Sequence, residues 1–538
     1  MSFQQLLRQH LRIEQLWVMA AITSGFIHSV LTILIPVSIG KYYEIVFHTS
    51  SNKGRILKML GISLDGNITH FFLFFFGIVV LRGVFGTIER YLTNIQGERF
   101  ARLLREQLFA KQITVSLTQF REKIMGKYLL RYSSDFKSLK RYYSIGILTF
   151  VKDVLFFGTS LYFLFHLQVQ LTLLLLAALV VFFLINTLLN RKIKDIDQQK
   201  RDLRSGLVAF ITQRFAAMSA IKSLSRETEE IRKFNRRSER IYTVNRGYQR
   251  QAAPMNAMVP TLLYGYLGIM LVYLYVSRAD ALLSSGELVS YILLLLMLFP
   301  TFRRLIKVRN VWRSGQISSV TYNQLLGQTV EQHTEASVEF TPELHSLAWK
   351  NLSFYSGKQI RQEFGWQMQI GQINHLQEAD TDAVLAVLTG AQPALKGHLI
   401  LNGETTLAHV AIGSRIAVAS YSIPLYGKDL TEALQIKERN IPKAQKLLAK
   451  LGVELTEEAF SEPIGDHGNL LSYRERKLLI IARSILSSKP ILWLEEPFAG
   501  LPVETRYRLW DVLQELIPNR TIVVASLETV PNPVESVS

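Results

Sequence analysis

The chain has 538 residues, carries a formal net charge of +18 at pH 7 and contains no cysteine. A disulfide, a cysteine-ligated zinc site and a cysteine nucleophile are therefore excluded. Hydrophobic residues make up 49% of the sequence and the mean hydropathy is +0.17, and both values favour a membrane protein. The positive charge is concentrated in residues 99–141 and 191–250, between apolar runs. This pattern indicates the cytoplasmic side of a membrane and not a surface for nucleic acid.

Six apolar segments have about the length that a helix needs to cross a bilayer core of roughly 30 Å. The third and fourth are separated by a short polar turn, and the fifth and sixth by SRADALLSSGE, so we expect two tight hairpins on the outer side. The predicted spans are residues 16–40, 68–92, 142–166, 168–190, 255–278 and 284–304.

The two remaining connections, residues 93–141 and 191–254, are long, and their apolar residues recur at helical spacing. We expect helices that leave the membrane, reverse and return, so that each connection ends in a helical tip in the cytoplasm. Within the spans, Arg82 is a candidate for the substrate path, because an arginine inside a membrane is costly. The alternative, which we favour, is that Arg82 faces the bundle interior or extends toward the interface.

The composition changes near residue 323, where the apolar runs end and a polar stretch begins. We interpret residues 323–343 as a linker between a membrane unit (1–322) and a C-terminal unit (344–538). In the C-terminal unit short apolar runs such as HLILNG and RTIVVAS alternate with helical patterns such as KAQKLLAKLG. Such alternation favours an α/β domain with a largely parallel sheet.

This order of six spans followed by an α/β unit resembles the half-transporters of the ATP-binding cassette (ABC) exporter family. LTILIPVSIGKYYEI resembles the first span of the family, and LTQFREKIMGKYLLRYSSDFKSLKRYY and AMSAIKSLSRETEEIRKF resemble its two intracellular loops. In the family, the tips of these loops are short coupling helices that press on the cassettes. The resemblance places them near 133–141 and 212–224. The coupling residues that it implies are Asp135, Lys137, Ile221 and Lys222.

The C-terminal unit resembles an ATP-binding cassette in the order and spacing of its motifs. Tyr355, in NLSFY, falls near the aromatic residue that stacks on adenine. The signature region, normally LSGGQ, keeps Leu471 and Ser472 but continues with Tyr473, Arg474 and Glu475. In a dimer these residues would face the nucleotide on the partner's cassette.

The catalytic strand and the switch also depart from the family pattern. In ILWLEEPFAGLP, Glu495 stands where the family has its magnesium-holding Asp, and Glu496 keeps the carboxylate of the general base. Leu527 falls where the family has its switch His. We favour a structural role for Glu496, because a base without a phosphate in reach does no chemistry.

The loop that should hold phosphate reads QEADTDA, from Gln377 to Ala383. A phosphate loop of the form G-x-x-x-x-G-K-[S/T] supplies backbone N–H groups and a lysine, and this stretch has neither glycine nor lysine. Glu378, Asp380 and Asp382 would instead repel an anion: two unit charges 4 Å apart interact by about 4 kcal/mol at an effective dielectric of 20. We therefore expect no tight nucleotide binding and no metal site in this chain's own cassette.

The resemblance implies a subunit of an exporter in the cytoplasmic membrane of a bacterium, with its cassette in the cytoplasm. We favour the catalytically silent half of a heteromeric exporter, in which ATP and Mg²⁺ are bound only through the partner half-transporter. The alternatives are a membrane scaffold or regulatory subunit without transport, and an active homodimeric exporter with divergent motifs. The expected partners are a second half-transporter and the lipid bilayer, with room for further secretion or accessory proteins and with no nucleic acid.

Overall fold

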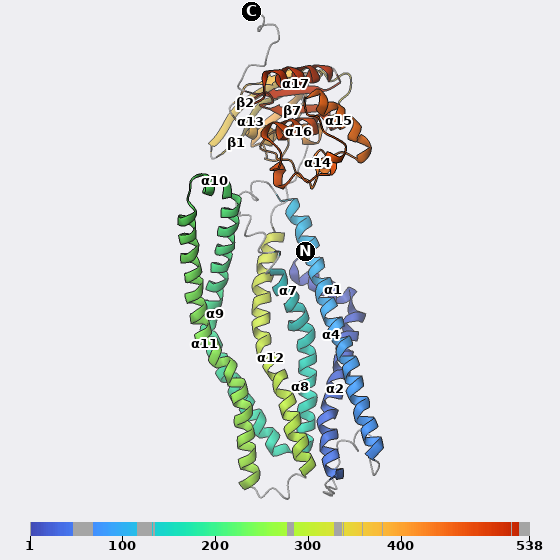
Figure 1. Cartoon of the computed structure of the whole chain (residues 1–538), viewed down its shortest axis with the longest axis vertical. Coiled ribbons are helices and arrows are strands. Elements are labelled where there is room, and N and C mark those ends of the chain that lie inside the picture. The colour runs from blue at the N-terminus through green and yellow to red at the C-terminus, as the bar shows by residue number, and fades with distance from the viewer. Residues whose placement is uncertain are drawn as a thin grey trace, which may run out of the picture. The chain divides into compact units, whose positions relative to one another are not determined.

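Two compact units make up the chain (Figure 1). One contains the helices as far as α12 and the other contains the strands. The computed structural model describes residues 2–46, 68–115, 132, 135–276, 285–327, 336, 338–357, 359–378, 380–517 and 519–526.

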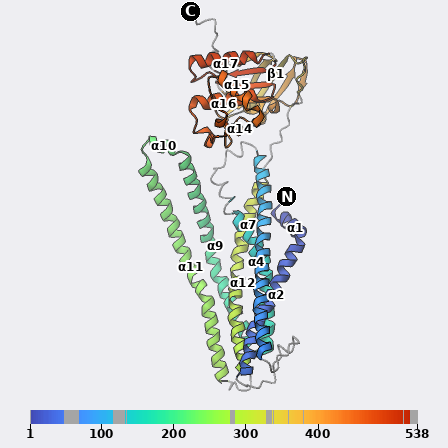
Figure 2. The same cartoon turned by 45° about the vertical axis from the view of Figure 1, so that its right-hand side comes forward.

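The first unit is built from long helices that run alongside one another (Figures 1 and 2). Over their described residues the six predicted spans are helical apart from Gln168, and 142–166 runs from the end of α7 through η2 into α8, so the prediction of a helical membrane bundle is confirmed. Four helices have a long apolar window, and α9 and α11 contain the shorter apolar stretches Val169–Ile185 and Pro260–Val276. The helices of this unit are α1 (Phe3–Ile13), α2 (Gln15–Val46), α4 (Ile68–Ile113), α7 (Phe136–Tyr143), the π-helical turn η2 (Ser144–Thr149), α8 (Phe150–Leu167), α9 (Val169–Ala216), α10 (Met218–Ser223), α11 (Glu227–Val276) and α12 (Ser285–Leu326).

Small residues allow α2 and α12 to cross closely. A Cβ atom at Gly40 would lie 1.9 Å from Ser290 Oγ and 2.4 Å from the backbone oxygen of Gly286. Ser290 Oγ in turn donates to the Pro36 carbonyl oxygen at 3.3 Å. Any larger side chain at Gly40 must therefore push the two helices apart.

The helix α1 lies against the bundle through one face. Its start is capped reciprocally by Ser2 and Gln5, and Phe3 and His10 are buried against the ring of Phe100 at centroid distances of 5.8 and 5.2 Å. Burial lowers the pKa of His10, and its Nε2 has no hydrogen-bond partner among the described residues. The docked helix thus favours a neutral imidazole.

The prediction of a separate coupling helix near 133–141 is wrong for the residues described there. Phe136–Tyr143 continues without a break through η2 into α8, because its apolar residues Phe136, Leu139 and Tyr143 are buried against the bundle. Residues 116–131 and 133–134, which complete this connection, lie outside the described residues. In the second connection, the short helix α10 joins α9 to α11 within the predicted range 212–224.

The second unit combines two four-stranded sheets with helices. The sheet β3-β8-β7-β6 is parallel, as predicted from the alternation of strands and helices. The sheet β2-β1-β4-β5 is antiparallel and was not predicted, since β2 buries few of its residues and its sequence QIRQEFGWQMQ alternates only weakly. The strands are β1 (Ser346–Ser356), β2 (Gln359–Gln369), β3 (Ile373–Leu376), β4 (Lys396–Leu401), β5 (Thr405–Leu407), β6 (Ile416–Ala419), β7 (Ile491–Glu495) and β8 (Thr521–Ala525).

Helices flank the parallel sheet and supply much of its buried surface. Leu478 to Ala482 of α16 and Leu509 and Leu513 of α17 pack with β7 and β8 in one core. The antiparallel sheet packs against α13 and the other side of the parallel sheet in a second core, where Trp349 and Trp366 stack at 5.5 Å. The helices of this unit are α13 (Thr381–Leu388), η4 (Gly413–Arg415), α14 (Leu430–Ala433), η5 (Glu438–Asn440), α15 (Ile441–Lys450), η6 (Glu458–Ser461), η7 (Asp466–Gly468), α16 (Tyr473–Leu486) and α17 (Val503–Glu515).

Candidate functional site

The turn between β3 and α13 stands where a cassette would hold phosphate. Gly371 and Gly390, which bracket it, both have positive φ angles of 71° and 76°. Between them the sequence contains no glycine, and residues 377–380 alone connect the strand to the helix. A backbone of this length and composition offers little room for the nest of N–H groups that surrounds a phosphate.

The guanidinium group of Arg361, a residue of β2, lies beside this turn. Arg361 pairs with Glu378 at 2.6 Å and with Asp380 at 3.7 Å, and it lies over the ring of Phe364 at 5.6 Å. Two of the carboxylates at this turn are therefore paired with a cation of the same chain. Sequence reasoning missed Arg361, since nothing in QIRQEFG marks a residue that reaches a turn seventeen positions away.

A network of hydroxyl groups closes around Glu495 at the end of β7. Thr381 Oγ1, the first residue of α13, donates to Glu495 Oε1 at 2.6 Å. Ser420 Oγ donates to Glu495 Oε2 and lies 2.6 Å from Ser422 Oγ. Ser422 Oγ then donates to Asp382 Oδ1 at 3.1 Å. The carboxylates of Glu495 and Asp382 are thus both held by hydroxyl groups of the same chain.

Glu496 adopts a strained backbone at the end of β7. Its φ is 43°, in the left-handed region that non-glycine residues rarely enter. Its N–H donates to the Ala525 carbonyl oxygen at 2.9 Å, and its Oε2 accepts from Ser526 Oγ at 2.8 Å. The predicted switch position, Leu527, lies outside the described residues.

The signature region forms the start of α16. Ser472 is the N-cap: its Oγ accepts from the N–H of Glu475 at 3.2 Å, and its own N–H donates to Glu475 Oε2 at 2.9 Å. These hydrogen bonds lower the pKa of Glu475. Both side chains therefore serve as a capping box, a role that the sequence allows to be predicted from the S-x-x-E spacing.

The side chains that replace the signature glycines lie on the surface of this helix start. Tyr473 is exposed, lies 5.5 Å from the ring of Tyr421 and contacts Gly500. Arg476 lies over Tyr421. The Arg476 guanidinium is 4.8 Å from the centroid of the Tyr421 ring and donates a hydrogen bond to the Tyr421 hydroxyl. Leu471 packs partly into the core and Arg474 is exposed. The structure thus joins the signature region to the loop after β6.

The remaining predicted residues lie on separate elements. Tyr355, at the end of β1, has an exposed ring, and its carbonyl oxygen accepts from Gln392 Nε2 at 2.8 Å. Asp135 accepts from Ser318 Oγ of α12 at 3.0 Å, whereas Lys137 is exposed.

Ile221 and Lys222 lie on α10, at the tip of the α9–α11 hairpin. Lys222 pairs with Glu227, the first residue of α11, at 3.2 Å. This pair spans the turn that reverses the chain.

Arg82 faces α2 within the bundle. Its Nε donates to Thr32 Oγ1 at 3.0 Å, and its carbonyl oxygen lies 3.0 Å from His28 Nδ1. The side chain is half-buried, which agrees with the interpretation that it faces the bundle interior.

Two ion pairs between membrane helices were not predicted. Lys152 of α8 pairs with the buried Glu89 of α4 at 2.7 Å. Arg304 of α12 binds both carboxylate oxygens of the buried Asp153, at 2.8 and 2.9 Å. The partners are more than 60 and 150 residues apart in the sequence, so spacing alone offers no signal for either pair.

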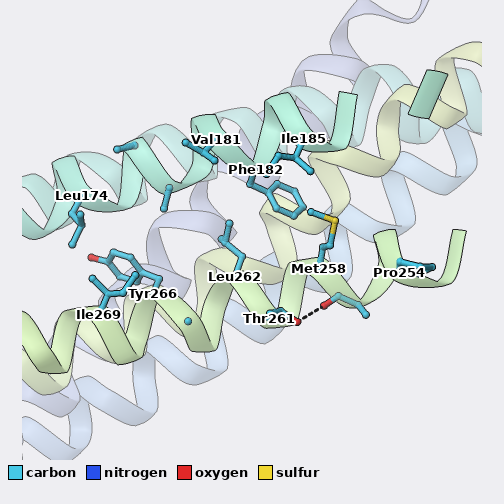
Figure 3. A pocket seen from close by; sticks show the side chains of 14 residues that line it. Leu174, Val181, Phe182, Ile185, Pro254, Met258, Thr261, Leu262, Tyr266 and Ile269 are labelled. Carbon is cyan, nitrogen blue, oxygen red and sulfur yellow. Dashed lines mark hydrogen bonds between the residues drawn. The ribbon is translucent and has the colours of Figure 1, made fainter. Parts of the chain in front are cut away.

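An apolar groove of about 720 Å³ runs between α9 and α11 (Figure 3). Phe182 and Leu174 line it from α9, and Met258, Leu262 and Tyr266 line it from α11. The hydroxyl of Tyr266 donates to the Leu171 carbonyl oxygen at 2.9 Å. A groove with this lining suits hydrocarbon.

Comparison with known proteins identifies the family. The sequence model of the ABC transporter transmembrane region matches residues 18–302, which is more than half of the chain. The chain belongs to the ABC transporter family. It is an ABC exporter half-transporter in which the transmembrane domain is fused to a C-terminal nucleotide-binding-type domain, and the fold class predicted from the sequence is confirmed.

Relatives along most of the ABC transporter chain are distant in sequence. It is 21% identical over 523 residues to the uncharacterized ABC transporter ATP-binding protein YknV of Bacillus subtilis (strain 168), covering 91% of this chain and 82% of that protein. It is 22% identical over 522 residues to the ATP-dependent lipid A-core flippase of Haemophilus influenzae (strain 86-028NP), covering 91% and 87%.

A solved structure shares the fold of this ABC transporter. The structure of a bacterial Atm1-family ABC exporter with ATP bound superposes with a TM-score of 0.77 at 14% identity, and covers 96% of this chain and 91% of the other. The predicted localisation is confirmed: the exporter crosses the cytoplasmic membrane several times and keeps its cassette in the cytoplasm. Exporters of this kind dimerise within the bilayer.

Proposed function

We propose that this chain is the catalytically silent half of a heteromeric ABC exporter, whose partner binds ATP and Mg²⁺. The observation that carries the proposal is the pairing of Arg361 with Glu378 and Asp380 at the turn between β3 and α13. The Arg361 guanidinium therefore pairs with two carboxylates at the turn where an active cassette would need open N–H groups and a lysine.

The second support is the closed network around Glu495. A magnesium ion bound with ATP needs a free hydroxyl and a free carboxylate. Here the Thr381 hydroxyl donates to Glu495, and Ser420 holds the other oxygen of that carboxylate. The residues present therefore do not fit Mg-ATP at this chain's own site.

The signature region supports a different role toward the partner's nucleotide. Ser472 and Glu475 cap α16, and Tyr473 and Arg474 extend from the positions where glycines would let the backbone approach a γ-phosphate. ATP held by the partner would meet a bulkier surface with the Arg474 charge. We propose that hydrolysis at that composite site is slow or absent.

The test is the ATPase activity of the purified chain in detergent or nanodiscs, beside a Glu496→Gln variant. The proposal expects no Mg-dependent turnover above background in either protein, and no saturable binding of a fluorescent ATP analogue. Turnover by the unmodified chain that Glu496→Gln abolishes would contradict the proposal and favour an active homodimer.

The second arm tests transport by the assembled complex. Reconstituted with the partner half-transporter, the chain should support an inward- to outward-facing change when ATP is added. Absence of that change, with a partner that also lacks a phosphate loop, would favour a scaffold without transport.

A further inference from the structure

The first residue of α1 lies at the last turn of α12. Phe3 donates its backbone N–H to Asn323 Oδ1 at 2.7 Å, across 320 positions of the sequence. Because an N–H at the start of a helix has no partner within that helix, Asn323 supplies one from another element. The carbonyl oxygen of Asn323 accepts from the N–H of Gly327 at 2.9 Å, which closes the final turn of α12. One asparagine therefore joins the start of α1 to the end of α12.

The ring of Phe3 contacts three helices. It meets Phe100 of α4, Tyr142 of α7 and Tyr322 of α12 edge-on, at centroid distances of 5.8, 6.0 and 6.3 Å, and the residue is only 3% exposed. Tyr322 is also buried, and its hydroxyl donates to the Leu104 carbonyl oxygen of α4 at 3.1 Å. Phe3 thus fills the space in which α4, α7 and the end of α12 meet.

The other end of α1 is tied to α4. Glu14, the C-cap residue of α1, pairs with Arg99 at 2.6 Å and accepts from Gln96 Nε2 at 3.1 Å. The Arg99 guanidinium also lies 5.2 Å from the centroid of the Trp17 ring, near the start of α2. The 11 residues of α1 span about 16 Å. We call residues 3–14 the strap, because they run beside α4 from the start of α2 to the end of α12 (Figures 1 and 2).

Docking on the bundle keeps the strap helical. An isolated helix of this length is marginal in water, and Phe3, Leu6 and His10 bury one face of α1. The opposite side, which includes Gln4 and Arg8, is exposed. A strap that left the bundle would therefore lose its helix together with its position. Docked and undocked are two distinct states of this segment.

The end of α12 is the point from which the chain leads to the cassette. α12 ends at Leu326, and a polar stretch of sequence follows it before β1 begins at Ser346. The last carbonyl groups of a helix have no partner within it, and helix ends fray. The final residues TYNQLL include Thr, Tyr and Asn, which favour a helix less than Ala or Leu. Contacts from outside α12 are therefore needed to keep its last turn in place.

We propose that the strap holds the last turn of α12 against α4 and α7, so that a movement of the segment after α12 reaches the bundle through a fixed joint. With the strap undocked, the last turn of α12 frays and the joint loosens, while the rest of the bundle stays folded. This inference concerns the chain's own joint and is independent of whether the cassette binds ATP.

Hydrogen exchange of the full-length chain in nanodiscs measures the joint. Peptides that cover residues 320–327 report on the end of α12, and peptides that cover 305–313 report on an earlier part of the same helix. The double variant Phe3→Ala, Leu6→Ala removes the apolar face of the strap. We expect its exchange to rise at least about tenfold over 320–327 and less than about twofold over 305–313, because local opening exposes the amides of one segment without global unfolding.

A distance measurement shows whether the strap has left the bundle. The chain contains no cysteine, so spin labels on Gln9→Cys and Gln324→Cys, both at exposed positions, attach there alone. The otherwise unmodified chain should give one narrow distance, and the double variant a broad distribution at longer distances. The matched control Gln4→Ala, Arg8→Ala changes the exposed side of the same helix and should leave both the distance and the exchange unchanged.

A single substitution gives the same comparison if the double variant does not fold. Phe3→Leu keeps a buried apolar side chain but removes the three edge-on ring contacts, and we expect its exchange over 320–327 to rise about threefold. Unchanged exchange in Phe3→Leu would then overturn the inference.

Three results with the double variant would also overturn the inference. The first is an undocked strap with unchanged exchange over 320–327. The second is a strap that stays docked without its apolar face. The third is an equal rise over 305–313, because α1 would then stabilise the whole bundle and not the joint.

Discussion

Replacing Glu495 by alanine removes the acceptor at the centre of the hydroxyl network in the cassette. Its carboxylate accepts from Thr381 Oγ1 at 2.6 Å and from the buried Ser420. A hydrogen bond to a charged group contributes about 1.5–3 kcal/mol. Ser420 keeps Ser422 as a partner and Thr381 is only half-buried, so we expect a net loss of about 3 kcal/mol from the two bonds.

The corresponding fall in thermal stability is measurable. For domains of 150–250 residues, each kcal/mol shifts Tm by about 2–4 °C, so Glu495→Ala should lower the Tm of the cassette by about 6–12 °C. Tryptophan fluorescence of the full-length chain follows this transition, since Trp493 lies in the same strand. Glu454→Ala, at an exposed position without a described partner, is the matched control and should shift Tm by less than about 2 °C.

Comparing the Glu495→Ala and Glu495→Gln variants also tests whether Glu495 has a structural or a catalytic role. Glu495→Gln keeps the shape and one acceptor oxygen, and we expect a smaller fall in Tm than with alanine. A shift for Glu495→Ala no larger than that of the control would refute the reasoning from the hydrogen-bond network. Loss of a measurable ATP turnover in Glu495→Gln would refute the structural assignment itself.

Three further predictions concern other parts of the molecule. Because burial lowers the pKa of His10, the undocked state of α1 binds the proton more readily; docking should weaken by up to about 1.4 kcal/mol per pH unit as pH falls below 6.5. Trp17 fluorescence should report this loss, and His10→Phe should abolish the pH dependence; an unchanged profile in that variant would contradict the prediction. Gly40→Ala, which places a Cβ 2.4 Å from a backbone oxygen of α12, should destabilise by about 1–3 kcal/mol, whereas Gly83→Ala, with nothing within 4 Å, should not; equal melting temperatures would count against the close crossing. Arg361→Ala leaves two carboxylates of the β3–α13 turn without their cation and should lower Tm by about 2–4 °C at 50 mM salt and less at 500 mM; no difference between the two salt concentrations would show that the pairing contributes nothing.

Apolar runs and periodicity were enough to predict the membrane helices and the parallel sheet. Residues 169–190 of one predicted span lie inside α9 because a run of hydrocarbon side chains fits a bilayer only as a helix. The antiparallel sheet escaped prediction because β2 buries few of its residues. Weak burial leaves a weak alternation in the sequence.

Residues that were missed at the candidate site act across long separations in the chain. Arg361 and Glu378 meet because β2 lies beside the turn, and Ser420 meets Glu495 because β6 and β7 are neighbours in the sheet. Spacing along one element predicts caps such as Ser472 and Glu475. It does not predict which loops the strand order brings together.

The Arg361 pair also bears on how this cassette could change over evolutionary time. A lysine introduced at the turn would lie beside the Arg361 guanidinium and the two carboxylates that already pair with it. Glycines introduced there would make the loop more flexible but would not remove the Arg361 side chain. Several substitutions would have to arise together before any one of them brought a benefit. Under the proposed function, the Arg361 pair would therefore oppose a return of nucleotide binding, because no single substitution at the turn removes both the guanidinium and its two carboxylates.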